Sequence, residues 1–381
     1  MSFFLRQKKK SHIIIDLGSH SIKAAIFEKP STGVVPNNMR KVVKRLNAAD
    51  QGDRLSDSLH EMLAVLLKEQ ANTPEKIIIG VGPNIATTSL QEWKIDSLHL
   101  RESLTQAHFQ KYFQDLFNTH RTGTRAMLGY PVAIEINGYP ATISLLAGHN
   151  PSLIKEITLR TIMLEFMDKA GSAFGELKKM FSGVEIEFIP LQGPVAEVLS
   201  SVCGIENAIL VDVGASSTAL MMIRDGRLLQ LSSFLIGSDR FSHHIVKTAG
   251  GTFAEAEDVT RQYSQGLVSK NEQAEFSHIF SEEAGEWKKE CIKALESCYP
   301  VAPLPQDFYL FRGGSYLPEI RSSLWSRDIL KNFSAFESPR VHIVQASQIF
   351  NNDSLNGLIA GPEDVGLASL MHYSLSHKPI F

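Results

Sequence analysis

Short apolar runs that end in an aspartate and a loop of small residues organise this chain. The clearest run is Ala208–Val211, which has the length and composition of a buried strand. Asp212 follows it, and the loop Gly214–Ser217 leads into a second apolar run, Thr218–Ile223, and by a turn into Arg227–Phe234. Such a hairpin directs backbone N–H groups and hydroxyls into one space, where phosphate binds well. The aspartate at the strand end is placed to hold a hydrated metal ion beside that phosphate.

The same pattern recurs near the N-terminus, over His12–Glu28. There an apolar strand ends at Asp16, small residues follow at Gly18, Ser19 and Ser21, and a second strand begins. A single hairpin with a small-residue turn is usually only a hairpin, so the repetition carries the functional interpretation. Two such hairpins far apart in one chain predict an internal duplication whose halves face each other across a cleft.

A third element, Phe308–Ile320, combines an apolar strand, the bend Gly313-Gly314 and a helix start. Two phosphate hairpins followed by a glycine bend after a late strand are the pattern of the actin, Hsp70 and sugar-kinase superfamily, which this chain resembles. Within it the closest resemblance is to the FtsA/PilM family of bacterial actin-like ATPases, and first to the FtsA-type cell division protein. The resemblance implies an α/β, actin-like (ribonuclease H-like) duplicated two-domain fold with a cleft, plus a small inserted α+β subdomain.

The order of the patterns divides the chain into the parts of such a fold. The insert is expected at 84–151, with a helix over Leu100–Asn118 and strands over Ala126–Ile136 and Ala141–Ala147. A long helix is expected next, over Ser152–Phe181. The expected division is a flexible basic tail at 1–10, a first actin-like domain at 11–83 and 152–204, the insert at 84–151, a second actin-like domain at 205–361, and a closing helix and tail at 362–381.

Composition and charge narrow the classes of function. The 381 residues are 43% hydrophobic and 21% charged, which is ordinary for a globular protein, and the net charge of −3 argues against a nucleic-acid binder. No run of about 18 apolar residues occurs, so nothing is expected to span a membrane. The first ten residues, MSFFLRQKKK, are typical of a solvated tail or of a peripheral contact with an anionic membrane. The basic side chains of the predicted strand Val34–Arg45 are interpreted as a solvated sheet edge.

The resemblance also implies a nucleotide site, with ATP and Mg as the expected cofactors. Asp16 and Asp212 are expected to hold the Mg ion through water, and Glu257, in a segment similar to the family's ribose-binding helix, is expected to contact the sugar. Ala215, Ser216 and Ala219 depart from the residues usual in the second FtsA hairpin, so hydrolysis stays open and at most a slow ATPase is expected. The complete candidate cofactor-binding set is Asp16, Gly18, Ser19, Ser21, Lys23, Asp212, Gly214, Ala215, Ser216, Ser217, Gly237, Glu257, Gly313, Gly314 and Ser315.

Several functions are compatible with this pattern. The first is an ATP-binding scaffold of FtsA type that assembles at the cytoplasmic face of the inner membrane, self-associates and recruits division proteins through a tubulin-like partner. The second is a PilM-type cytoplasmic scaffold of type IV pilus assembly, held by a membrane-anchored pilus protein. A small-molecule (sugar) kinase and a nucleotide-free pseudo-ATPase are the alternatives of another class. No catalytic residue is identified, and no nucleic-acid partner is expected.

Overall fold

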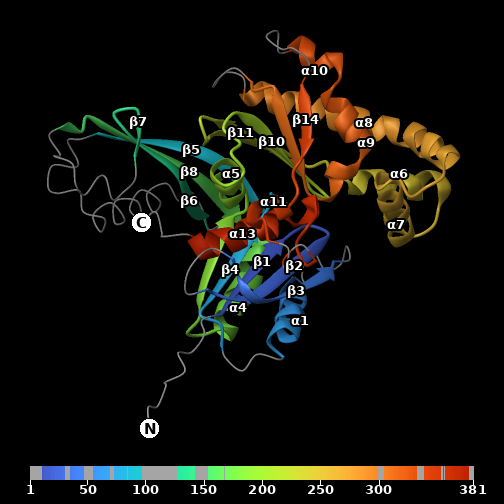
Figure 1. Ribbon diagram of the computed structural model, residues 1–381. Coiled ribbons are helices and arrows are strands. Elements are labelled where there is room, and N and C mark those ends of the chain that lie inside the picture. Colours follow the sequence, from blue (N-terminus) through green and yellow to red (C-terminus); the bar gives the residue numbers. More distant parts are fainter. Residues whose placement is uncertain are drawn as a thin grey trace.

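Two five-stranded sheets with one strand order form the frame of the molecule (Figure 1). The computed structural model describes residues 11–30, 35–46, 55–68, 73–83, 85–96, 127–141, 153–166, 168–298, 304–332, 339–352, 355 and 357–376. The first sheet has the order β3-β2-β1-β4-β9 and the second the order β12-β11-β10-β13-β14. Their strands are β1 (Ser11–Leu17), β2 (Ser21–Glu28), β3 (Asn37–Arg45), β4 (Lys76–Val81) and β9 (Glu185–Pro190), then β10 (Ala208–Val213), β11 (Thr218–Arg224), β12 (Arg227–Phe234), β13 (Asp307–Phe311) and β14 (Arg340–Ile343).

The two sheets also agree in strand direction and register. In each, the central strand pairs antiparallel with the next strand of its hairpin and parallel with a later strand. Asp16 stands opposite Lys23 on β2 and Gly80 on β4, whereas Asp212 stands opposite Ala219 on β11 and Phe311 on β13. The predicted duplication is therefore confirmed.

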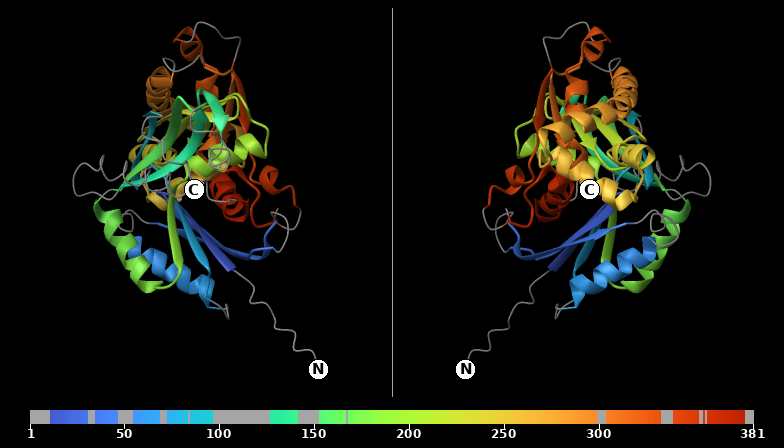
Figure 2. Two further views of the ribbon diagram at one scale, coloured as in Figure 1. Left: turned by 90° about the vertical axis from the view of Figure 1, so that its left-hand side faces the viewer. Right: turned by 90° about the vertical axis from the view of Figure 1, so that its right-hand side faces the viewer.

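Helices lie between the two sheets and on their outer faces (Figures 1 and 2). Helices α5 and α13 pack between the sheets, in one core with residues of both β1 and β10. Helices α1 and α4 cover the outer face of the first sheet, and α6 to α10 cover that of the second. Their bounds are α1 (Leu55–Leu67), α4 (Asp168–Met180), α5 (Gln192–Ser201), α6 (Asp239–Ala249), α7 (Phe253–Ser264), α8 (Lys270–Cys298), α9 (Pro318–Leu324), α10 (Arg327–Asn332), α11 (Ser347–Phe350) and α13 (Val365–Ser376), with the short 3-10 turns η3 (Gly313–Tyr316) and η4 (Pro362–Asp364).

Burial of both sheet faces explains the continuous apolar runs in the sequence. Along β10, Leu210 faces α5 and α13, whereas Ile209 and Val211 face the helices on the outer side. Along β1, Ile14 and Ile15 divide in the same way. A strand covered by helices on both sides needs apolar residues at every position, so its sequence does not alternate.

A third, four-stranded sheet follows the first strand set, in the order β5-β8-β6-β7. Its strands are β5 (Ala86–Asp96), β6 (Met127–Ile136), β7 (Tyr139–Ala141) and β8 (Glu156–Phe166). An inserted sheet is therefore present, but it reaches Phe166, past the expected bound at 151, because β8 belongs to it. Figure 1 shows this sheet extending to one side of the two large sheets. The helix predicted over Leu100–Asn118 and most of the strand predicted over Ala141–Ala147 lie outside the described residues.

The helix predicted over Ser152–Phe181 is wrong in its first half. Residues 156–166 form β8, the strand that pairs with both β5 and β6, and the helix α4 begins only at Asp168. Ile157, Leu159, Ile162 and Leu164 are all buried. Spacings of four and five residues predict a helix, but β-branched and apolar residues at nearly every position of this segment suit a strand that is buried on both faces.

Two further features concern the chain ends and the membrane. The basic tail predicted at 1–10 lies outside the described residues. Among the residues that the structure describes, no helix is long and apolar enough to cross a membrane.

Candidate functional site

The hairpins β1–β2 and β10–β11 close with the same turn. The Gly18 N–H donates to the Ser21 carbonyl oxygen at 3.1 Å, and the Gly214 N–H donates to the Ser217 carbonyl oxygen at 2.9 Å. A Cβ atom added to Gly18 would lie 2.8 Å from the Ser21 oxygen, and one added to Gly214 would lie 3.0 Å from the Ser217 oxygen. Both turns need glycine because the chain folds back too closely for a side chain.

The two turns meet in the space between the sheets. The Ser216 N–H donates to Ser19 Oγ at 3.1 Å, so the halves are joined there directly. Gly237 packs against the second turn, where an added Cβ would lie 2.3 Å from the Ala215 carbonyl oxygen and 2.4 Å from that of Gly214. The small residues of this segment thus allow three backbone segments to approach one another.

A cavity of 330 Å³ lies between the two turns and the glycine bend at the start of η3. Its volume falls at the low end of the range for small-molecule sites, roughly 300 to 1,000 Å³. It is bounded by residues from both halves of the duplication. The predicted site residues that line it are Gly18, Ser19, Ser21, Lys23, Asp212, Gly214, Ala215, Ser217, Glu257, Gly313 and Gly314.

Four predicted site residues support the cavity without lining it. Ser216 links the two turns, and Gly237 packs beneath the second one. Ser315 is fully buried and donates from Oγ to the Arg312 carbonyl oxygen at 2.7 Å. Asp16 is buried behind the cavity wall, with 1% of its surface exposed.

Arg312 is the main site residue that the sequence analysis missed. Its Nη2 donates to Asp16 Oδ1 at 3.0 Å, and its Nε lies 2.8 Å from Asp212 Oδ1. One guanidinium therefore joins the two strand-end aspartates, one from each half. A charged residue directly before Gly313-Gly314, at the end of an apolar strand, was the available signal.

Burial and charge act in opposite directions on this triad. Burial alone would lower the pKa of Arg312, but the carboxylates of Asp16 and Asp212 outweigh it and raise that pKa. Burial raises the pKa of Asp212, and the guanidinium of Arg312 opposes this rise. Because the arginine stays charged at any relevant pH, it holds the two carboxylates as a permanent counter-charge.

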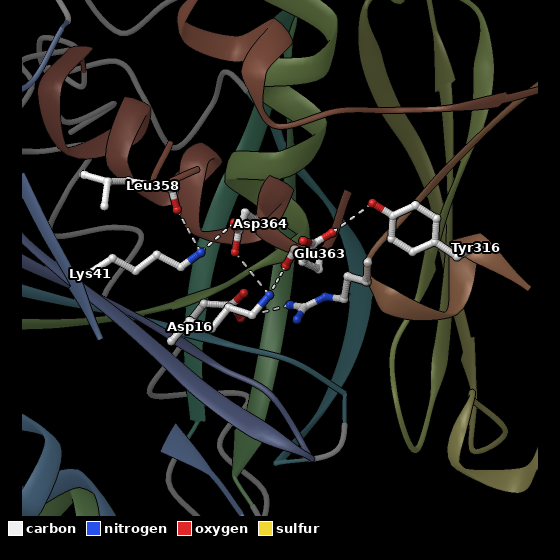
Figure 3. Close-up of polar contacts among 8 residues, drawn as sticks. Asp16, Lys41, Tyr316, Leu358, Glu363 and Asp364 are labelled. Atoms are coloured by element: carbon white, nitrogen blue, oxygen red, sulfur yellow. Dashed lines mark hydrogen bonds and ion pairs between the residues drawn. The ribbon is translucent and has the colours of Figure 1, made fainter. Parts of the chain in front are cut away.

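A second charged group lies next to the triad, around Asp364 (Figure 3). Lys41 Nζ donates to Asp364 Oδ2 at 2.6 Å, and Lys23 Nζ lies 3.3 Å from Asp364 Oδ1. Lys23 also donates to the carbonyl oxygen of Glu363, whose side chain accepts from the Tyr316 hydroxyl at 3.3 Å. Burial lowers the pKa of Lys23, and Asp364 partly offsets that effect.

The solvated-edge interpretation of the basic residues on β3 is therefore wrong for Lys41. β3 is an edge strand, as predicted, but the side chain of Lys41 is 16% exposed and bound to Asp364. The partner comes from the far end of the chain, so the pattern around β3 gave no sign of it.

A contact between the halves also borders the cavity near α7. His20 Nε2 lies 2.7 Å from Glu257 Oε1, and Arg45 Nη1 lies 3.8 Å from Glu257 Oε2. The hydrogen bond with Glu257 raises the pKa of His20, and the same bond lowers the pKa of Glu257. Glu257, expected to contact a ribose, lines the cavity and holds a side chain of the other half.

The aspartate pair does not fit a hydrated Mg²⁺ ion in this arrangement. Asp16 does not line the cavity, and its Oδ2 is buried with no hydrogen-bond partner among the described residues. Asp16 Oδ1 and Asp212 Oδ1 are already bound by the guanidinium of Arg312. Within the described part of the chain, no group of three or more His, Cys, Asp or Glu residues is placed to hold a metal ion. The Mg site stays a prediction from the sequence.

No family model matches the chain, and no curated protein is similar enough in sequence to match it. Solved structures do match. The PilM–PilN type IV pilus biogenesis complex is similar with a TM-score of 0.62 and 12% identity, covering 96% of this chain and 99% of that chain. MreB5 of Spiroplasma citri bound to ADP has a TM-score of 0.48 and 10% identity, with 96% of each chain covered. EutJ from Carboxydothermus hydrogenoformans has a TM-score of 0.46 and 12% identity, covering 95% of this chain and 89% of that one.

The chain has the actin-like ATPase fold. The similarity to the PilM structure extends over almost the whole length, and the duplicated sheets agree with it. The fold class expected from the sequence is thus confirmed. The FtsA-type assignment stays a prediction, because similarity at this level of identity reaches only the fold.

Proposed function

We propose that this protein is a nucleotide-binding, actin-like scaffold of PilM type, which takes ATP or ADP in the cavity between its two halves. The observation that carries the proposal is the 330 Å³ cavity, which is bounded by two copies of one small-residue turn and by the bend Gly313-Gly314. Tight turns with small side chains let phosphate approach the backbone closely. The glycine bend leaves room for the adenosine.

Nucleotide acts in this proposal as a clamp. The cavity walls come from both halves, and the halves already meet at Ser19–Ser216 and at His20–Glu257. A ligand that contacts both walls stabilises one relative orientation of the halves, which is what an assembling scaffold requires.

Turnover is proposed to be slow. Phosphoryl transfer needs a positioned water and neutralisation of the developing charge. Three of the four acidic residues that line the cavity are engaged: Asp212 with Arg312, Glu257 with His20, and Glu363 with Tyr316. The fourth is Asp239, the first residue of α6. We expect steady-state phosphate release below about 1 per second, the low end for kinases. Faster release would contradict the clamp role and favour the kinase alternative.

The proposed partner is a membrane-anchored pilus protein, which would hold the scaffold at the cytoplasmic face of the inner membrane. The support is the PilM–PilN complex, whose PilM fold is matched over 96% of this chain. Co-elution with the cytoplasmic segment of such a pilus protein is the expected result. Co-elution with a tubulin-like division protein instead would restore the FtsA-type role. Sedimentation with anionic vesicles, with and without residues 1–10, tests direct membrane contact; we expect equal pelleting of both forms.

Calorimetric titration with ATP and with ADP tests the nucleotide site. Gly313 lines the cavity, and a Cβ atom added there would meet no atom within 4 Å, so Gly313→Val adds bulk at the cavity where there is open space. We expect this variant to bind at least about tenfold more weakly, which corresponds to about 1.4 kcal/mol.

The matched control is Gly285→Val on α8. Gly285 also has open space around it and does not line the cavity. Its affinity is expected to equal that of the wild type. Absence of binding by the wild type at millimolar nucleotide would refute the proposed function and favour the nucleotide-free alternative.

A further inference from the structure

The guanidinium of Arg312 occupies the point where the two halves present their strand-end carboxylates. Asp16 belongs to β1 and Asp212 to β10, the central strands of the two sheets. The side chains of Asp16, Asp212 and Arg312 are 1%, 8% and 14% exposed. A buried carboxylate needs a compensating positive charge, and here a single side chain of the protein supplies it to both.

The backbone of Arg312 is held in an uncommon conformation that aims this side chain. Its φ angle is +67°, in the region that residues other than glycine rarely adopt. The Arg312 N–H donates to the Pro362 carbonyl oxygen at 2.8 Å, and the Arg312 carbonyl oxygen accepts from the N–H and Oγ of Ser315. Because contacts on both sides fix the residue, the surrounding structure compensates for its unfavourable backbone conformation.

The charged group around the two aspartates is balanced without a divalent ion. Asp16, Asp212 and Asp364 are balanced by Arg312, Lys23 and Lys41, so these six side chains sum to zero. A metal ion between the aspartates would have to displace the guanidinium, and it would add two positive charges to a group that is already neutral. Asp16 Oδ2, the remaining oxygen of that carboxylate, is buried close to Gly366, where an added Cβ would lie 2.8 Å away.

We propose that Arg312 takes the place of the divalent metal, so that the cavity binds its nucleoside diphosphate or triphosphate as a metal-free anion. This inference rests on the proposed function and specifies how the same site recognises its ligand. The planar guanidinium binds two carboxylates at fixed angles and cannot lose its proton, so it neutralises them permanently. It also ties the two halves together when no ligand is present.

The first test is titration of the wild type with ATP in excess EDTA and again in excess Mg²⁺. We expect the two dissociation constants to differ by less than about threefold, well within the tenfold that 1.4 kcal/mol would give. Affinity at least about tenfold weaker in EDTA would overturn the inference while leaving the proposed function intact. Absence of binding in both conditions would refute the proposed function, and the second test then judges this inference alone.

The second test measures Mn²⁺ binding without nucleotide, by electron paramagnetic resonance. Arg312→Gln removes the charge and frees the carboxylates of Asp16 and Asp212, so its Mn²⁺ affinity should exceed that of the wild type by at least about tenfold. Arg312→Lys keeps one positive charge and should show no gain, whereas a purely structural role of the arginine would change both variants alike.

Equal Mn²⁺ affinity of the wild type and Arg312→Gln would overturn the inference, whether both bind the ion or neither does. In the first case the guanidinium would not exclude a metal, and in the second the carboxylates would not form a cation site that it fills. If Arg312→Gln does not fold, the EDTA comparison on the wild type decides.

Discussion

The two hairpins that bound the cavity have the same backbone but different charges. Both turns are closed by a glycine N–H and a serine carbonyl oxygen three residues later. In the first hairpin, however, a lysine, Lys23, stands opposite the aspartate, and in the second an alanine, Ala219, stands there. The second half instead places Arg312 after β13, where the first half has Val81 after Gly80 of β4.

This difference shows that the duplication fixes the shape of the site and leaves its chemistry to single residues. A repeated strand order and turn provide two similar walls. The cation that joins them, Arg312, has no counterpart in the first half. Function therefore depends on positions where the halves differ, and variants at matched positions test this view.

The largest effect is expected from exchanging the residues that pair with the two aspartates on the parallel neighbours, Gly80 on β4 and Phe311 on β13. Gly80→Phe would give the first sheet the residue that the second has at Phe311. A Cβ atom at Gly80 would already lie 2.6 Å from Leu370 Cδ1, so the phenyl ring would force α13 away from β4. We expect the free energy of unfolding to fall by about 3 kcal/mol or more, measured by urea denaturation.

The reverse change, Phe311→Gly, provides the comparison. Phe311 is fully buried, so its removal leaves a cavity in the core between the sheets and should cost about 3–5 kcal/mol. Unchanged stability in Gly80→Phe would mean that α13 does not pack against the first sheet as described.

A smaller effect is expected in the turns themselves. Gly18→Ala places a Cβ atom 2.8 Å from the Ser21 oxygen, and Gly214→Ala places one 3.0 Å from the Ser217 oxygen. Because the opposing atoms belong to the backbone and cannot move aside, each variant should lose about 1–3 kcal/mol of stability, with the larger loss at Gly18. A loss at Gly214 alone would show that the first turn is not closed in the same way. Thermal denaturation of the two variants side by side gives the order.

The smallest effect concerns pH, at the position where the first turn has His20 and the second has Ser216. The bond with Glu257 raises the pKa of His20 above its ordinary 6.5; Asp239 adds to this rise, whereas burial and Arg45 oppose it. Stability from a raised histidine pKa is present below 6.5 and is lost as pH rises through the raised value. The same bond lowers the pKa of Glu257, whose contribution is present above 4.5 and lost as pH falls through the lowered value.

The ion pair therefore contributes fully between pH 4.5 and 6.5, and its contribution falls as pH rises through the raised pKa of His20. NMR titration of the His20 ring should give a lower pKa in Glu257→Gln than in the wild type. Because both side chains are partly exposed, the loss of stability should stay below about 1 kcal/mol. An unchanged His20 pKa in Glu257→Gln would show that the contact does not persist in solution.

The sequence was sufficient for the parts of the fold that depend on local pattern. The buried strands around Asp16 and Asp212 were recognisable because strands covered on both faces are continuously apolar, and the repetition identified the duplication. The strand β8 was missed because apolar residues at Ile157, Ile162 and Phe166, spaced by five and four positions, match a helical spacing, and a strand buried on both faces shows no alternation. Helix and strand are then separated only by what packs against them.

The site was predictable in its turns but not in its charges. Glycines and serines at a strand end indicate a phosphate turn without further information. The pairings of Arg312 with Asp16 and of Lys41 with Asp364 join residues from opposite ends of the chain. Nothing in the local pattern specifies such partners, because they follow from how the two halves are placed against each other.

A crystal structure grown with ADP and Mg²⁺ tests the central claim most directly. The account predicts phosphates between the turns Gly18–Ser21 and Gly214–Ser217, with the guanidinium of Arg312 still bound to Asp16 and Asp212 and no metal between them. A nucleotide bound elsewhere would contradict the site. A metal ion between the two aspartates, with Arg312 displaced, would contradict the role given to the arginine.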